Sequence, residues 1–142
     1  MHAIVLASGS PRRRQLLEML RIPFRVIPPD VDEHVLPGEK PHDYVTRLSR
    51  AKAQAVVQRA PGEVILAADT TVVLGGKIFE KPTSPTNAVE MLEQLQGKTH
   101  DVLTAVAVAE NGRLEQALDV SRVTVRPNSR KTLEEYVATG EP

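Results

Sequence analysis

A short motif near the N-terminus has the residue types of an anion-binding site. Residues 8–14 read SGSPRRR and follow the apolar run 3–7, which predicts a buried strand. Ser10 and Pro11 favour the start of a helix, and the free N–H groups of a helix N-terminus attract anions. The positive charges of the arginines at 12–14 are unfavourable at the positive end of the helix dipole. A bound polyphosphate would compensate for this cost. A solvated arginine cluster explains the residue types equally well, and the spacing is not that of a P-loop.

Lys52 is a charged residue on an apolar stripe. A helix expected over about 41–59 carries this stripe, and Lys52 lies four residues after Leu48 and four before Val56. A lysine that extends along the stripe to solvent is the more frequent case. The functional alternative is a lysine whose ammonium binds phosphate.

Asp69 comes directly out of the apolar run 64–68. A buried carboxylate without compensation is costly, so it should pair with a cation, bind a metal or lie where ligands gather at strand ends. A turn-forming or helix-capping Asp is the alternative, but no helix signal follows it. With Thr70 beside it, a functional carboxylate is the favoured interpretation.

Other charged segments are weak signals taken alone. Lys81 precedes Pro82 in a loop, where a lysine without function is the more frequent case. Acids in the loop before the long helix can bind Mg²⁺ together with waters, although loop acids are usually only solvated. These acids are Asp30, Asp32 and Glu33. The three histidines that lie after residue 30 lack metal-ligand spacing, so no zinc site is expected. Together, the arginines, lysines and carboxylates suit metal-assisted phosphoryl chemistry.

The elements that must position these residues alternate between strand and helix. Strands are expected over 3–7, 24–27, 64–74, 77–79, 102–109 and 116–125. Helices are expected over 12–20, 41–59, 85–96 and 131–139, with hairpin turns at Gly75-Gly76 and Asn111-Gly112. The buried faces are expected to hold Leu16, Leu17 and Leu20 in the first helix and Ala88, Met91, Leu92 and Leu95 in the third. This alternation predicts an α/β domain with a mixed sheet.

Composition excludes several classes of function. The 142 residues suit one domain. The 18 basic and 18 acidic side chains balance, so bulk charge gives no argument for nucleic acid or membrane binding. The absence of cysteine excludes disulfides and thiolate chemistry. Neither a secretory signal nor an apolar run of about 20 residues is present, so the cytoplasm is the expected location.

The motifs, in this order, resemble the Maf family, the septum-formation-inhibitor proteins that act as nucleoside triphosphate pyrophosphatases. The similar segments run along nearly the whole chain. They are SGSPRRR at 8–14, VDE at 31–33, AKA at 51–53, AADT at 67–70, KP at 81–82, GKTHDVLT at 97–104 and YVATGEP at 136–142. The resemblance implies an elongated mixed sheet flanked by helices, with two lobes around a cleft, as in inosine triphosphate pyrophosphatases.

The resemblance also implies a reaction and the residues for it. Water would attack the α–β phosphate linkage of the triphosphate with the help of Mg²⁺ or Mn²⁺. Asp69 would accept the proton of that water and contact the metal, and Glu33 would help to place the metal or the water. The triphosphate would be held by Ser8, Arg13, Lys52 and Lys81.

Two positions resemble markers of a subgroup. Proteins of the dTTP/UTP type are similar to this chain at Arg12 and Thr70, whereas the 7-methyl-GTP type has an aromatic residue and Gln there. A dTTP/UTP pyrophosphatase is therefore expected, with a role in cell-division arrest or in cleaning the nucleotide pool. The 7-methyl-GTP type is one alternative, and the resemblance also implies homodimer formation.

Family members usually continue beyond the position of Pro142, with a segment similar to Lys-Ala-Gly-Ala-Tyr and a following Gln. The single expected domain, 1–142, would then lack the C-terminal segment, and exposed apolar surface would favour pairing with another chain. A protein that binds nucleotide or regulates septation without catalysis is the resulting alternative. A nucleic-acid binder built on the arginines is disfavoured, because the chain is neutral and only 3% aromatic.

Overall fold

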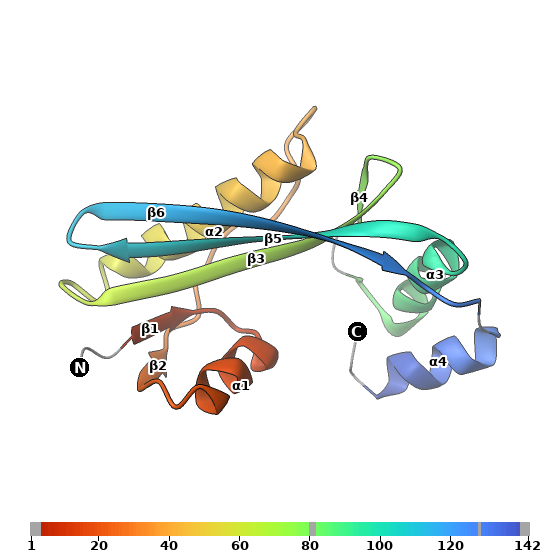
Figure 1. Cartoon of the computed structure of the whole chain (residues 1–142), viewed down its shortest axis with the longest axis horizontal. Helices are drawn as coiled ribbons and strands as arrows, with labels where there is room; N and C mark the ends of the chain where they lie inside the picture. Colours follow the sequence, from red (N-terminus) through yellow and green to blue (C-terminus); the bar gives the residue numbers. More distant parts are fainter. Residues whose placement is uncertain (1–3, 80–81, 128, 140–142) are drawn as a thin grey trace. The chain divides into compact units, whose positions relative to one another are not determined.

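The fold is a mixed α/β arrangement, as predicted. The computed structural model describes residues 4–79, 82–127 and 129–139. Its strands (Figure 1) are β1 Ile4–Ala7, β2 Phe24–Val26, β3 Val64–Leu74, β4 Lys77–Phe79, β5 Thr99–Glu110 and β6 Arg113–Thr124. Its helices are α1 Pro11–Met19, α2 Pro41–Val57, α3 Pro85–Leu95 and α4 Arg130–Ala138. All ten elements occur where the sequence predicted them, with small shifts of their ends; β5 and β6 each begin three residues early.

One pairing in the sheet decides where the site forms. The strand order is β2-β1-β3-β5-β6, and β4 pairs with β3. β1 runs parallel to both β2 and β3, whereas β4 runs antiparallel to β3. Ala7, the last residue of β1, pairs with Ala67. The turn after β1 and the second half of β3 therefore begin at the same edge of the parallel pair.

Contacts divide the chain into two compact units. The first comprises residues 1–70 and 104–119, and the second comprises 71–103 and 120–142. In the first unit, α2 packs on β1 through small and β-branched side chains. The core cluster consists of Val5, Ala7, Ala53, Val56, Ala60, Ile65, Ala67, Ala107 and Ala109. Its many alanines let backbones approach closely, which compensates for the scarcity of aromatic residues.

The expected buried face of α1 is wrong in part. Only Leu17 is buried, whereas Leu16 is 58% exposed and Leu20 67% exposed. Successive residues of a helix are separated by about 100° around its axis, and residues four apart by only about 40°. Leu16 therefore projects away from Leu17, and Leu20 lies beyond the last residue of α1, at its C-cap. Along the nine residues of α1, the direction of Leu17 is covered and that of Leu16 is not.

The second unit contains the β3–β4 hairpin and the contacting pair α3 and α4. Serines cap both helices: Ser84 Oγ accepts the N–H of Asn87 at 3.0 Å, and Ser129 Oγ accepts that of Thr132 at 3.2 Å. Arg130 of α4 reaches Glu93 of α3 at 2.9 Å. α3 buries the expected Ala88 and Leu95, together with Val89; the other two expected residues, Met91 and Leu92, are half-buried.

The β5–β6 turn has the backbone that its sequence predicts. Asn111 and Gly112 have φ angles of 49° and 78°, the left-handed pair of a two-residue hairpin turn. A Cβ atom at Gly112 would meet nothing within 4 Å, so a substitution there tests the backbone alone.

We expect Gly112→Val to lower the free energy of unfolding by about 1–2 kcal/mol, because a β-branched residue resists positive φ. Asn111→Gly is the matched control, and it should change this free energy by less than about 0.5 kcal/mol. Urea denaturation followed by circular dichroism measures both. Equal stability of Gly112→Val and the unchanged protein would contradict this account of the turn.

Candidate functional site

Lys52 is a buried lysine at the centre of an ion cluster. Its Nζ lies 2.9 Å from Oδ1 of Asp69 and 2.9 Å from Oε1 of Glu33. The side chain of Lys52 is 10% exposed and that of Asp69 is 7% exposed. A lysine that extends to solvent is therefore the wrong interpretation. Lys52 lies on the apolar stripe of α2 because two carboxylates neutralise its ammonium there.

The second carboxylate oxygen of Asp69 is not bound by Lys52. Oδ2 of Asp69 is buried and has no hydrogen-bond partner among the residues that the structure describes. A buried polar atom without a partner costs about 1–3 kcal/mol, and more when it is charged. Such atoms are rare in folded proteins and mark places where a ligand, water or ion belongs. Asp69 thus has one oxygen fixed by Lys52 and a second available for chemistry.

Arg13 belongs to the same cluster. Its Nη2 donates to Oγ1 of Thr70 at 3.0 Å, and Thr70 Oγ1 lies 3.0 Å from Oγ1 of Thr104 on β5. Burial lowers the pKa of Arg13, while the charges of Asp69 and Glu33 raise it. The guanidinium stays protonated in any case. It is therefore a partly desolvated cation close to both acids, and Thr104 is a contact that sequence reasoning missed.

The turn between β1 and α1 presents Arg13. Ser8 is buried, and its Oγ accepts the N–H of Ser10 at 3.0 Å. Ser10 is the N-cap of α1, as predicted, with Pro11 as the first helical residue. The predicted strand–turn–helix arrangement is thus confirmed, and it brings the N-terminus of α1 to the end of β1.

The structure separates other residues that the sequence grouped. Of the three arginines, Arg13 joins the cluster, whereas Arg12 is exposed and Arg14 pairs with Glu18 of its own helix at 3.3 Å. Of the three loop acids, Glu33 is the one whose contact with Lys52 the described residues show. Asp30 is exposed, and Asp32 is exposed and bonds the neighbouring His34.

Lys81 falls outside the described residues. Within the described part of the chain, no group of three or more His, Asp and Glu side chains is placed to hold a metal ion. The carboxylates of Glu33 and Asp69 are the pair that converge on one point, the Nζ of Lys52.

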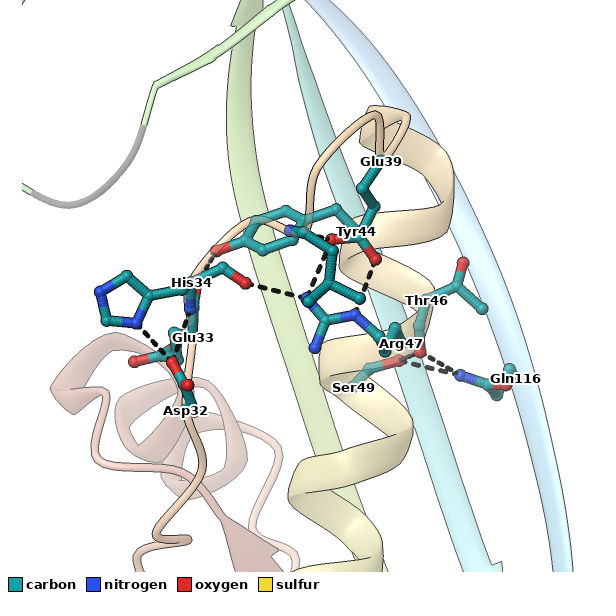
Figure 2. Close-up of polar contacts among 10 residues, drawn as sticks. Asp32, Glu33, His34, Glu39, Tyr44, Thr46, Arg47, Ser49 and Gln116 are labelled. Atoms are coloured by element: carbon teal, nitrogen blue, oxygen red, sulfur yellow. Dashed lines mark hydrogen bonds and ion pairs between the residues drawn. The ribbon is translucent and has the colours of Figure 1, made fainter.

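A second polar network, which sequence reasoning missed, surrounds the loop that carries Glu33 (Figure 2). Arg47 of α2 bonds Glu39 and the carbonyl of His34, and Tyr44 donates to the carbonyl of Glu33. Tyr44 and Arg47 lie three residues apart on a helix, so a shared face was predictable. Their partners lie in an irregular loop, and no periodic pattern in the sequence predicts the conformation of such a loop.

Comparisons with known proteins agree with this fold. The family described as "Maf-like protein" matches residues 3–142. A dTTP/UTP pyrophosphatase of Photorhabdus laumondii is 46% identical over 143 residues, covering 100% of this chain and 73% of that protein. A dTTP/UTP pyrophosphatase of Pectobacterium atrosepticum is 48% identical with the same coverage. The chain belongs to the Maf family.

Among solved structures, the fold is similar to that of two Ham1 proteins. The Ham1 protein of Coxiella burnetii has a TM-score of 0.55 at 18% identity, covering 86% of this chain and 72% of that one. That of Staphylococcus aureus has a TM-score of 0.52 at 16% identity, covering 84% and 70%. At this identity the likeness concerns the fold alone. In the described residues, no helix is long and apolar enough to cross a membrane.

We expect Lys52→Met to lower the free energy of unfolding by about 3 kcal/mol, because it leaves two carboxylates without their cation. Adding Asp69→Asn should restore part of that loss, since it removes one of the two charges. Urea denaturation at neutral pH provides the measurement, with Lys98→Met as the control at an exposed lysine. If the double variant instead lost the sum of the free energies that the two single variants lose, the ion cluster would not be the cause of the destabilisation.

Proposed function

We propose that this protein is a nucleoside triphosphate pyrophosphatase that hydrolyses dTTP and UTP to the monophosphate and pyrophosphate. Membership of the Maf family and the names of relatives that are 46–48% identical over the full chain support this activity. The observation that carries it is the free Oδ2 of Asp69, next to an oxygen that Lys52 holds. That arrangement is a carboxylate oriented by one oxygen and ready to act with the other.

The reaction follows from the charges of the cluster. The oxygen of a water molecule bonds to the α-phosphorus as the bond from that phosphorus to the α–β bridging oxygen breaks, and pyrophosphate leaves. Oδ2 of Asp69 takes the proton of the water, as a general base must within hydrogen-bond reach. Lys52 and Arg13 supply positive charge where the leaving pyrophosphate gains negative charge. The burial of Lys52 and the partial burial of Arg13 strengthen this stabilisation.

A divalent cation fits the donor set. Mg²⁺ prefers carboxylate oxygens and is usually held by one or two of them together with substrate phosphates. Glu33 and Asp69 provide two carboxylates, and one oxygen of Asp69 lacks a partner among the described residues. We propose that these two side chains hold Mg²⁺ or Mn²⁺. When bound, the cation neutralises phosphate charge and makes a coordinated water more acidic.

Recognition of the substrate involves further residues in this proposal. Ser8 shapes the turn at the N-terminus of α1, and Lys81 adds a second lysine for the phosphates. Arg12 and Thr70 would select dTTP and UTP over 7-methyl-GTP. Activity on the nucleotide pool would place the protein in the cytoplasm. The homodimer and a role in septum formation, both implied by the resemblance, stay predictions.

We expect Asp69→Asn to lower kcat for pyrophosphate release from dTTP and UTP by about 100-fold or more, the scale of general-base catalysis. Pyrophosphate release is measured with Mg²⁺ over dTTP, UTP, CTP, 7-methyl-GTP and ATP. Asp43→Asn, at an exposed acid of α2, is the control. No release from any nucleotide by the unchanged, folded protein would disprove the proposed activity.

We expect EDTA to abolish pyrophosphate release and added Mg²⁺ or Mn²⁺ to restore it. Glu33→Gln should raise the Mg²⁺ concentration that gives half of the maximal rate by at least about tenfold, since even indirect partners of a metal change its affinity on that scale. Full activity in EDTA would remove the metal from the proposal. An unchanged Mg²⁺ requirement in Glu33→Gln would remove Glu33 from the metal site.

A further inference from the structure

We propose that Arg47, Tyr44 and Glu39 form a clamp that fixes the acidic loop, residues 30–40, and thereby positions Glu33 against Lys52. Arg47 and Tyr44 would then be positioning residues for the reaction, since their hydrogen bonds go to the backbone of the loop and to Glu39. The effect on catalysis rests on the proposed function. The ordering of the loop does not, and it is tested separately below.

Arg47 holds the loop at two points (Figure 2). Its Nε donates to Oε2 of Glu39 at 2.7 Å and its Nη2 to Oε1 of the same carboxylate at 2.9 Å. Nη2 also donates to the carbonyl of His34 at 3.0 Å. Glu39 in turn accepts the backbone N–H of Leu36 at 3.1 Å. A forked Arg–carboxylate pair of this kind fixes direction as well as distance.

Tyr44 provides the contact nearest to the functional carboxylate. Its hydroxyl donates to the backbone carbonyl of Glu33, and its ring is buried. The guanidinium of Arg47 lies 5.7 Å from the centre of that ring, within the range of a cation–π contact. The carbonyls of two consecutive residues, Glu33 and His34, are therefore held by two side chains that also contact each other.

The clamp and the cation that Glu33 meets belong to one rigid element. Tyr44, Leu48 and Lys52 follow one another at four-residue intervals on α2, so they share a face of the helix. The loop is tied to the first of these positions, and Glu33 reaches the last at 2.9 Å. A helix is a stiff connection between such points, and functional groups are placed more accurately on helices than on loops.

The charges of the clamp also keep it apart from the site. The Glu39 side chain is 8% exposed, and it is neutralised by Arg47. The hydrogen bond from Arg47 lowers the pKa of Glu39, and the bond to Glu39 raises the pKa of Arg47. Both groups are therefore charged through the neutral range. Glu39 pairs with Arg47, while Glu33 pairs with Lys52.

The test uses two variants of the full chain. Arg47→Gln removes the fork, and Tyr44→Phe removes only the hydroxyl that donates to Glu33 while it keeps the buried ring. Arg50→Gln is the matched control, because Arg50 is an exposed arginine one turn further along the same helix. Hydrogen–deuterium exchange of residues 31–39 measures the order of the loop, and thermal unfolding checks that each variant folds.

We expect faster exchange of residues 31–39 in Arg47→Gln and, to a smaller extent, in Tyr44→Phe, with Arg50→Gln unchanged. With dTTP and Mg²⁺, kcat should fall about tenfold or more in Arg47→Gln and about three- to tenfold in Tyr44→Phe, the scales of a charged and a neutral hydrogen bond. KM should change little, because a contact that matters in the transition state lowers kcat. Neither variant should slow a protein that already carries Glu33→Gln.

Several results would overturn the proposal. They are unchanged exchange in both variants, full kcat in Arg47→Gln despite faster exchange, or losses that multiply with that of Glu33→Gln. Should the unchanged protein release no pyrophosphate, the proposed function fails, yet the exchange experiment still decides whether the clamp orders the loop. If Arg47→Gln does not fold, the exchange and kcat measurements on Tyr44→Phe decide the proposal.

Discussion

The first unit is organised by one ammonium group shared between two carboxylates. Lys52 comes from a helix, Asp69 from a strand and Glu33 from a loop, so a single atom connects three kinds of backbone. Removing charges from water is expensive, and only close pairing compensates for it. The position of each element is therefore constrained by the others. The parallel pairing of β1 with β3 adds the turn that presents Arg13 to the same region.

The sequence predicted the elements well because their signals are local. Apolar and β-branched residues in 64–74 indicated β3, and Asn111-Gly112 indicated the hairpin turn that joins β5 to β6. Asp69 and Lys52 were found for a related reason: a charged residue in an apolar segment must have a partner. The family resemblance then supplied their roles, which residue types alone left open.

The sequence did not reveal contacts that no periodic pattern marks. The Arg47–Glu39 pair joins a helix to an irregular loop, and the contact of Thr70 with Thr104 joins two strands across a long connection. No periodicity marks such pairs. The exposed side of α1 has another cause, since Leu16 and Leu17 are both apolar and only tertiary packing decides which of them is covered.

The free oxygen of Asp69 connects stability with function. The folded state bears the cost of a buried acceptor without a partner, and a water or cation bound there would remove that cost. Any ligand that binds the folded state alone also stabilises it by mass action. A buried acceptor without a hydrogen-bond partner is thus the feature expected of a binding site that holds no ligand. The rest of the cluster can bear the cost because the positive charges of Lys52 and Arg13 together match the negative charges of Glu33 and Asp69.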